Sequence, residues 1–318
     1  MDYSSSNWGK HHILIWKGLS CHWRVLGDPQ NQPLVLIHGF GASSDHWRNN
    51  AKFFASKGFC VYGLDLIGFG KSEQPSNKKI KSLDNRFWSD QLTNFLEDIV
   101  LCHNSNKAVL VGNSLGSLVA LTTIVLRPEL VKAIIAAPLP DPSLVQQISS
   151  VEKKWVKKIK VFVIKAFFYL LPLEIIVPLI SRTFLISQAL QFAYFRSIKA
   201  DNELQRLVKE PSQKTSAARA LRAMCIGMSL RPKDATATAL LRRLSENFVR
   251  PPILMIWGRE DKLIPLFSAE SLIKQHPWIK LLVIDKCGHC PHDESPKYFN
   301  ESILNWLEIH LKSSSKKV

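Results

Sequence analysis

Short, mostly apolar runs recur along the chain. They span residues 33–39, 60–68, 108–114, 131–138, 253–258 and 280–289. Runs of this length without polar alternation are typical of strands that are buried on both faces of a sheet. Residues 12–26 instead alternate loosely between apolar and polar side chains, which predicts an antiparallel pair of strands at the edge of that sheet.

Helical patterns separate several of these runs. Residues 84–103 carry apolar side chains on one broad face, residues 115–126 are apolar almost all round, and residues 295–311 form the last amphipathic pattern. Strands that alternate with helices predict a mainly parallel sheet with helices on both faces.

One long region breaks this alternation. Residues 139–250 contain no clear buried strand and read as helical. We therefore expect a core made of residues 1–138 and 251–318, with a helical cap of residues 139–250 inserted after the sixth main strand. The cap holds 19 Lys and Arg against 8 Asp and Glu, which is most of the net charge of +16. Such a charge suits an anionic surface, and no nucleic-acid-binding motif accompanies it.

The sequence Gly112-Asn113-Ser114-Leu115-Gly116 follows an apolar run and precedes a helical one. A serine between two small residues at a strand-to-helix turn is typical of a nucleophile elbow, in which a strained turn exposes the hydroxyl. A glycine-rich loop without a special role is the alternative. Two further polar residues at strand ends favour the elbow: Asp261 follows the run at 253–258, and His289 follows the last run.

Ser114, Asp261 and His289 follow one another along the chain in this order. One hydrolase architecture has its nucleophile, acid and base in the same order. A serine hydroxyl needs a base to take its proton, a histidine can do so near neutral pH, and an acid orients the imidazole. Glu260 and Asp141 are the rival acids, and His292 is the rival base. The N–H groups of Leu115 and Phe40 are the expected oxyanion hole.

Other polar residues near the strand ends have structural interpretations. We expect His38 to organise its loop and Asp65 to hold the loop after its strand. Cys287, Cys290 and His292 are too closely spaced to resemble a usual zinc site. No phosphate-binding glycine motif is present. We therefore expect neither a metal nor a cofactor.

These motifs together resemble the α/β-hydrolase superfamily. The segments HGFG, DLIGFGKS, GNSLG, WGREDKLIP and GHCPHDESP occur in order along nearly the whole chain. The resemblance implies an eight-stranded, mostly parallel sheet with a helical cap after the sixth strand. A serine nucleophile argues against haloalkane dehalogenases and epoxide hydrolases, which look similar but use aspartate at that position.

A narrower likeness is to the pheophytinase and chlorophyll-dephytylase-like hydrolases, through GNSLG and GHCPHDESP. It implies cleavage of a phytyl ester. The sequence departs from this pattern at Ser117, where a second glycine is usual, and at Lys262-Leu263. We expect a serine esterase that acts on a bulky apolar carboxylic ester. The alternatives are a C–C bond hydrolase, a cofactor-free perhydrolase, and a ligand receptor with little turnover.

The cap contains the strongly apolar stretch Val161–Ile180, which has about the length of a membrane span. It also contains Lys165, Glu174 and two prolines, so we expect a cap core and not a span. A basic face resting on an anionic membrane is a further expectation, thylakoid-like if the pigment-esterase likeness holds. Candidate pocket residues are Phe167, Phe168, Leu171, Phe192, Phe195 and Met224.

The expected location is cytoplasmic, because the first residues lack a secretory signal pattern. The six scattered cysteines fit reduced, mostly buried thiols.

Overall fold

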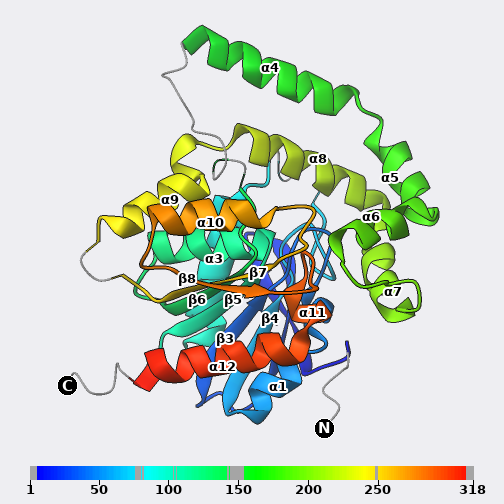
Figure 1. Cartoon of the computed structure of the whole chain (residues 1–318). Coiled ribbons are helices and arrows are strands. Elements are labelled where there is room, and N and C mark those ends of the chain that lie inside the picture. Colours follow the sequence, from blue (N-terminus) through cyan, green and yellow to red (C-terminus); the bar gives the residue numbers. More distant parts are fainter. Residues whose placement is uncertain are drawn as a thin grey trace.

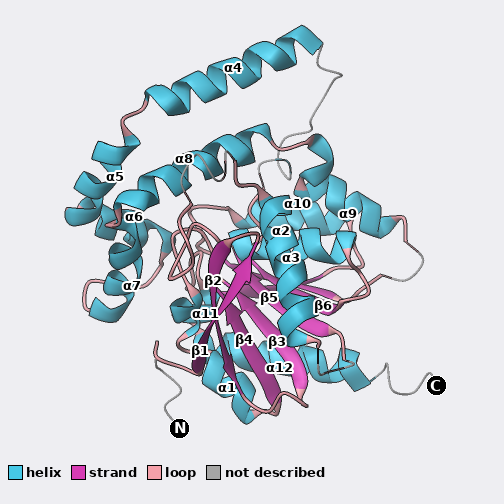
Figure 2. Ribbon diagram, turned by 180° about the vertical axis from the view of Figure 1, so that it is seen from behind, coloured by secondary structure: helices cyan, strands magenta, loops and turns pink. Residues whose placement is uncertain are grey.

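The computed structural model describes residues 6–75, 80, 82–102, 104, 106–141, 143, 154–247 and 250–312. Its centre is an eight-stranded sheet in the order β1-β2-β4-β3-β5-β6-β7-β8 (Figures 1 and 2). The strands are β1 (Lys10–Trp16), β2 (Leu19–Leu26), β3 (Gln32–Ile37), β4 (Phe59–Leu64), β5 (Ala108–Asn113), β6 (Val131–Ala137), β7 (Ile253–Gly258) and β8 (Lys280–Ile284). Strand β2 pairs antiparallel with β1 and β4, and all the other pairs are parallel.

The parallel strands β3 to β7 bury both of their faces, as the apolar runs predicted, whereas β8 is a half-buried edge strand with Lys280 exposed, contrary to the expectation for the run at 280–289. In β3, Val35 and Ile37 join one hydrophobic core, while Leu34 and Leu36 join the core on the opposite face. The first core is covered by α2 (Asn85–Phe95), α3 (Leu115–Leu126), α9 (Ala237–Ser245) and α10 (Leu266–Gln275). The second is covered by α1 (Ala51–Ser56) and α12 (Pro296–Lys312), which lie together below the sheet in Figure 1.

Short elements complete the core. They are the 3-10 helices η1 (Ser44–Trp47) and η4 (Lys233–Ala235), the π-helical turn η2 (Leu96–Val100) that extends α2, and α11 (Pro291–Glu294), which precedes α12. The predicted fold class, an eight-stranded and mostly parallel sheet with helices on both faces, is confirmed.

Five further helices lie between β6 and β7 and form the cap. They are α4 (Lys154–Leu170), α5 (Leu173–Arg182), α6 (Leu185–Ala193), α7 (Asn202–Ser212) and α8 (Thr215–Leu230). Helix α8 crosses above the sheet, and α4 is the outermost element of the molecule (Figure 1). The predicted cap, residues 139–250, extends beyond the helices that form the cap in the structure. Its last helix, α9, packs on α3 in the sheet layer because Leu240, Leu241 and Leu244 share one buried face.

No single helix among the described residues is long and apolar enough to cross a membrane. The segments Val161–Leu170 and Leu173–Ser181 meet a length and composition test only as a pair, and they are bent by 57° relative to one another.

Candidate active site

Ser114 occupies a strained turn between β5 and α3. Its φ is 51° and its ψ is −117°, in a region that non-glycine residues rarely adopt. A side chain at Gly116 would collide with the main-chain carbonyl of Ile37, and one at Gly112 would collide with the first turn of α3. The two glycines therefore allow the strand and the helix to meet at contact distance. The turn between them presents the Ser114 side chain to the cavity described below.

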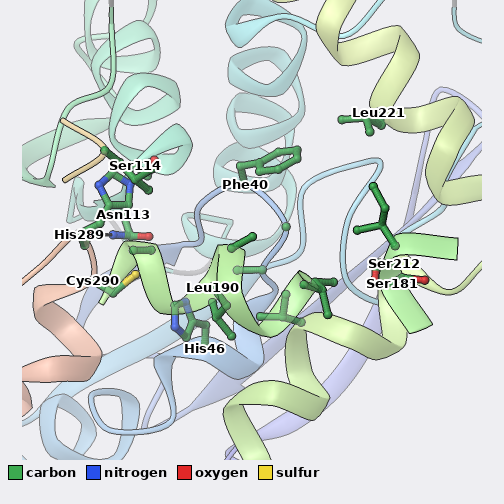
Figure 3. Close-up of a pocket in the computed structure, with 18 of the residues that line it drawn as sticks. Phe40, His46, Asn113, Ser114, Ser181, Leu190, Ser212, Leu221, His289 and Cys290 are labelled. Atoms are coloured by element: carbon green, nitrogen blue, oxygen red, sulfur yellow. Dashed lines mark hydrogen bonds between the residues drawn. The ribbon is translucent and has the colours of Figure 1, made fainter. Parts of the chain in front are cut away.

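Asp261 and His289 meet beside this turn. The Nδ1 atom of His289 lies 2.8 Å from Oδ2 of Asp261, and both side chains are buried. The other carboxylate oxygen of Asp261 accepts main-chain N–H bonds from Leu263 at 2.8 Å and from Ile264 at 2.9 Å. Ser114 and His289 lie next to each other at one end of the cavity (Figure 3). The structure thus brings these three side chains together.

The rival acids are engaged elsewhere. Asp141 forms a 2.7 Å ion pair with Arg231 and accepts the N–H of Ala237 at 2.7 Å, so its carboxylate ties the chain after β6 to η4 and α9. Glu260 accepts the N–H of Cys287 at 2.9 Å and so holds the loop after β8.

Two main-chain N–H groups, those of Leu115 and Phe40, are the predicted donors for an oxyanion hole. The N–H of Leu115 is at the first position of α3, where no intrahelical acceptor exists. Within the described part of the chain, neither this N–H nor that of Phe40 donates to a protein acceptor. Both residues border the same hollow as Ser114. Free donors of this kind, held by the backbone next to a nucleophile, can stabilise negative charge on a tetrahedral intermediate.

His38 and Asp65 connect the loops that surround the site. The Nε2 atom of His38 accepts the N–H of Leu66 at 3.0 Å, which links the loops after β3 and β4. Asp65 accepts main-chain N–H bonds from Ser44 at 2.6 Å and Lys71 at 2.9 Å. These contacts agree with the structural interpretation of both residues.

A cavity of about 650 Å³ extends from Ser114 into the cap. Ser114, Asn113 and His289 lie at one end, while Ser181, Ser212 and Leu221 lie at the other (Figure 3). The walls between them are mostly apolar side chains from the cap, including Leu173, Ile176, Val177, Ile180, Ile186 and Leu190. An apolar chamber with few polar groups at one end is suited to a lipophilic ligand that is held by its chain.

Five of the six predicted pocket residues do not line this cavity: Phe167, Phe168, Leu171, Phe192 and Phe195. Helix α4, which carries Phe167 and Phe168, lies outside the cavity wall, and Phe192 and Phe195 are largely exposed. The reason is that the cap helices are apolar on more than one face, so composition did not identify the face that lines the cavity.

The sixth, Met224, borders a second hollow of about 630 Å³. This hollow also contains Met228, Phe267 and the Asp141–Arg231 pair, and it shares Phe40 and Ser114 with the first cavity. Ser114 therefore lies where two chambers meet, which leaves room for both halves of a bulky substrate.

A buried chain of hydrogen bonds runs beneath the cavity and was not foreseen from the sequence. His46 lies 3.3 Å from His292 and 2.7 Å from the hydroxyl of Tyr194, which donates to Asp293 at 3.1 Å. Burial lowers the pKa of His46 to about 4 and lowers that of His292 below its usual range. With both histidines neutral, each has one N–H to donate: His292 donates to His46, His46 donates to the hydroxyl of Tyr194, and Tyr194 donates to the Asp293 carboxylate. His292 therefore belongs to this chain and not to the pair formed by His289 and Asp261.

The loop that carries His289 is attached to the cap and to the turn at Ser114. The N–H of His289 donates to the carbonyl of Ala193 at 2.8 Å, and Glu294 accepts the N–H of Phe195 at 2.7 Å. Asn113 donates to the carbonyl of His289 at 3.2 Å. The only sequence signal for Asn113 is its place directly before the serine of the G-x-S-x-G motif.

Cys287 and Cys290 are both buried, and burial raises the pKa of each thiol. Among the described residues, no group of three or more His, Cys, Asp or Glu side chains could hold a metal ion.

Two proteins of known name resemble this chain over most of its length. The chloroplastic pheophytinase of Arabidopsis thaliana is 28% identical over 95% of this chain and 67% of its own length. The 2-hydroxy-6-oxononadienedioate/2-hydroxy-6-oxononatrienedioate hydrolase of Burkholderia vietnamiensis is 25% identical over 87% of each protein.

Solved structures are similar in fold. A haloalkane dehalogenase variant from Bradyrhizobium elkanii superposes with a TM-score of 0.72 at 19% identity, and the match covers 96% of this chain and 99% of the dehalogenase. At this identity the likeness concerns the fold alone. The sequence model of the alpha/beta hydrolase fold family matches residues 32–296, which include the strained serine turn and the buried acid–histidine pair. This protein is a member of the α/β-hydrolase fold family and a hydrolase.

Proposed function

We propose that this hydrolase is a serine esterase that cleaves a carboxylic ester with a long or bulky apolar group. The observation that carries the proposal is the position of Ser114. Its strained turn lies beside the hydrogen-bonded pair of His289 and Asp261, at the end of a cavity of about 650 Å³ with apolar walls. The apolar part of the substrate occupies this cavity, and the other half lies toward the second hollow.

The proposed reaction follows from these positions. The Ser114 hydroxyl attacks the ester carbonyl carbon while His289 takes its proton, and Asp261 stabilises the imidazolium. The N–H groups of Leu115 and Phe40 bind the oxyanion of the tetrahedral intermediate. The C–O bond then breaks, the alcohol leaves with the proton from His289, and an acyl-enzyme remains. Water, deprotonated by His289, releases the acid and regenerates Ser114.

A series of para-nitrophenyl esters from acetate to palmitate tests the proposal, with Ser114→Ala measured alongside. We expect kcat/KM to rise with chain length and to fall at least about a thousandfold in the variant. A fluorophosphonate probe should label the wild type and the control Ser56→Ala, which removes an exposed hydroxyl at the end of α1, but it should not label Ser114→Ala. Full labelling of Ser114→Ala would refute the nucleophile.

Hydrolysis of a C–C bond is the second candidate, because the Burkholderia relative is named for a dioate substrate. The described lining of the main cavity includes no Lys or Arg that would pair with a carboxylate, which favours the ester. Product analysis on a matched ester and 1,5-diketone separates the two. Tight ligand binding without turnover on any substrate would instead support a receptor.

A further inference from the structure

The outermost helices of the cap expose an unusual amount of apolar surface. We call α4 and α5, residues 154–182, the outer arm. Nine of the 21 large hydrophobic side chains that are exposed in the described part of the chain belong to it. The most exposed include Leu170 at 82%, Phe162 at 73%, Ile175 at 69% and Leu179 at 64%. Apolar side chains that are concentrated in this way mark an interaction surface.

Helix α4 is apolar on two opposite faces, and only one of them is covered. Val161, Ile164 and Phe168 follow helical spacing and are half-buried on the side that contacts α8. Ile159, Phe162, Phe167 and Leu170 follow the same spacing on the other side and are exposed. The inner face packs against α8, whereas the outer face packs against no other part of the chain that the structure describes.

Helix α5 shows the same division next to the active-site cavity. Ile176 and Val177 line the cavity, whereas Ile175 and Leu179 point away from it and are exposed. Helix α5 of the outer arm therefore also forms a wall of the chamber that begins at Ser114. Figures 1 and 2 both show α4 held away from the sheet, with only α8 beneath it.

The charge of this region decides between possible partners. Helix α4 has the sequence KWVKKIKVFVIKAFFYL, with five lysines and no acidic residue. The exposed Lys165 lies among the exposed apolar side chains. A second copy of the chain would bring the same positive charges face to face across a symmetric interface, which is unfavourable. An anionic phospholipid surface is complementary to both the lysines and the apolar side chains.

We propose that the outer arm binds the surface of an anionic phospholipid bilayer. In this arrangement α4 lies along the interface, its exposed apolar side chains enter the boundary between headgroups and acyl chains, and Lys165 contacts a lipid phosphate, while the other lysines of the sequence add to the positive charge of the helix. No single helix of the arm is long enough to cross the bilayer, and the 57° bend between the segments Val161–Leu170 and Leu173–Ser181 suits helices that lie along its surface. Membrane binding does not depend on the chemistry of Ser114, so its test is independent of the test of the proposed esterase activity.

Co-sedimentation with vesicles tests the proposal. We expect binding to vesicles of phosphatidylcholine with phosphatidylglycerol that is at least about tenfold tighter than binding to phosphatidylcholine alone, and that weakens with added salt. The double variant Phe162→Ser/Leu170→Ser should lose about tenfold or more of this affinity, and Lys165→Glu should also weaken it. The matched control Ile13→Ser/Ile309→Ser removes side chains of 68% and 69% exposure from β1 and α12, and it should bind as the wild type does.

Three outcomes would overturn the proposal. One is equal binding to neutral and anionic vesicles, and another is equal loss of binding in the arm and control variants. The third is a concentration-dependent dimer, seen by analytical ultracentrifugation, that the arm variants abolish, since this would identify a second copy as the partner. An unchanged thermal unfolding midpoint in the arm variants shows that any loss of binding does not come from loss of the fold.

Discussion

The Oδ2 atom of Asp261 lies 2.8 Å from Nδ1 of His289, and the second oxygen of the same carboxylate is held by two main-chain N–H groups. The acid is thus oriented before substrate binds. Replacing Asp261 with Asn keeps its shape but favours the wrong tautomer of His289. We expect kcat on a para-nitrophenyl ester to fall about ten-thousandfold, with a small change in KM.

Glu260→Gln is the matched control for this change. Gln keeps an oxygen that can accept the N–H of Cys287, so we expect kcat to stay within about threefold of the wild type. A larger loss of kcat in Glu260→Gln than in Asp261→Asn would show that Glu260, and not Asp261, is the acid.

Gly116→Ala tests the close approach of α3 and β3. Alanine normally favours a helix, but here its methyl group would meet the carbonyl of Ile37. We expect a loss of about 1–3 kcal/mol in the free energy of unfolding, measured by urea denaturation, together with a loss of esterase activity. Gly18→Ala is the comparison, because its φ is 71° but no atom lies within 4 Å of the added methyl. It should cost about 1 kcal/mol and leave activity intact.

Val177→Trp tests which face of α5 meets the substrate. The indole ring would fill part of the cavity that the smaller valine leaves open. We therefore expect kcat/KM to fall at least about tenfold for long-chain esters and to change little for the acetate. Leu179→Trp places the same ring on the exposed face of α5 and should leave the chain-length profile unchanged. Equal profiles for the two variants would mean that the acyl chain binds elsewhere.

The sheet and the residues around Ser114 were accessible from sequence because both depend on local patterns. Strands buried on two faces are apolar along most of their length, as β3 and β5 are. The carboxyl ends of parallel strands meet at one edge, so polar residues that follow β5, β7 and β8 are brought together there. The turn at Ser114 has a local sequence signature, since only glycine fits at positions 112 and 116, two residues before and two residues after the serine.

The cap was predicted less well for the opposite reason. Its helices are apolar on several faces, and the face that lines the cavity is set by how they pack on α8, which no local pattern records. The buried chain from His292 through His46 to Tyr194 is made by residues far apart in sequence, 246 positions between the two histidines. Neither His46 nor Tyr194 lies in a recognisable motif, and only the fold brings them together.

This buried chain predicts how stability depends on pH. Burial lowers the pKa of His46 to about 4, whereas an unfolded histidine titrates near 6.5. The unfolded state therefore binds more protons between these values, and the free energy of unfolding must fall as the pH falls from about 6.5 toward 4. The slope should be on the order of 1 kcal/mol per pH unit for each histidine, seen in urea denaturation at several pH values.

His292→Phe should reduce that slope. Phenylalanine fits between Trp47 and Phe299, which already contact the imidazole ring, so the fold is kept while one titrating group is lost. The remaining slope reflects His46, which faces the charged groups of Asp293 and Arg48, together with His38 and His276, whose pKa values are also lowered by burial. A slope that is unchanged in His292→Phe would show that other groups cause the acid loss of stability.

Arg222 of α8 holds the corner between α4 and α5, and this contact predicts what fixes the outer arm. Its guanidinium donates to the carbonyls of Phe168 at 2.8 Å and Leu171 at 2.9 Å, and it pairs with Glu174. The Phe168 carbonyl is in the last turn of α4, where carbonyls lack intrahelical partners, and the Leu171 carbonyl lies in the corner between the two helices. Arg222→Met keeps the length of the side chain but removes all of these bonds.

We expect limited proteolysis at the α4–α5 corner to become at least about tenfold faster in Arg222→Met, while the sheet resists cleavage as before. Arg206→Met is the control, because within the described residues Arg206 forms an exposed ion pair with Glu210 on α7 and no other. Arg222→Lys should lie between the wild type and Arg222→Met, since one ammonium group cannot reach all three acceptors at once. Equal cleavage rates in the wild type and in Arg222→Met would mean that packing on α8 alone fixes the arm.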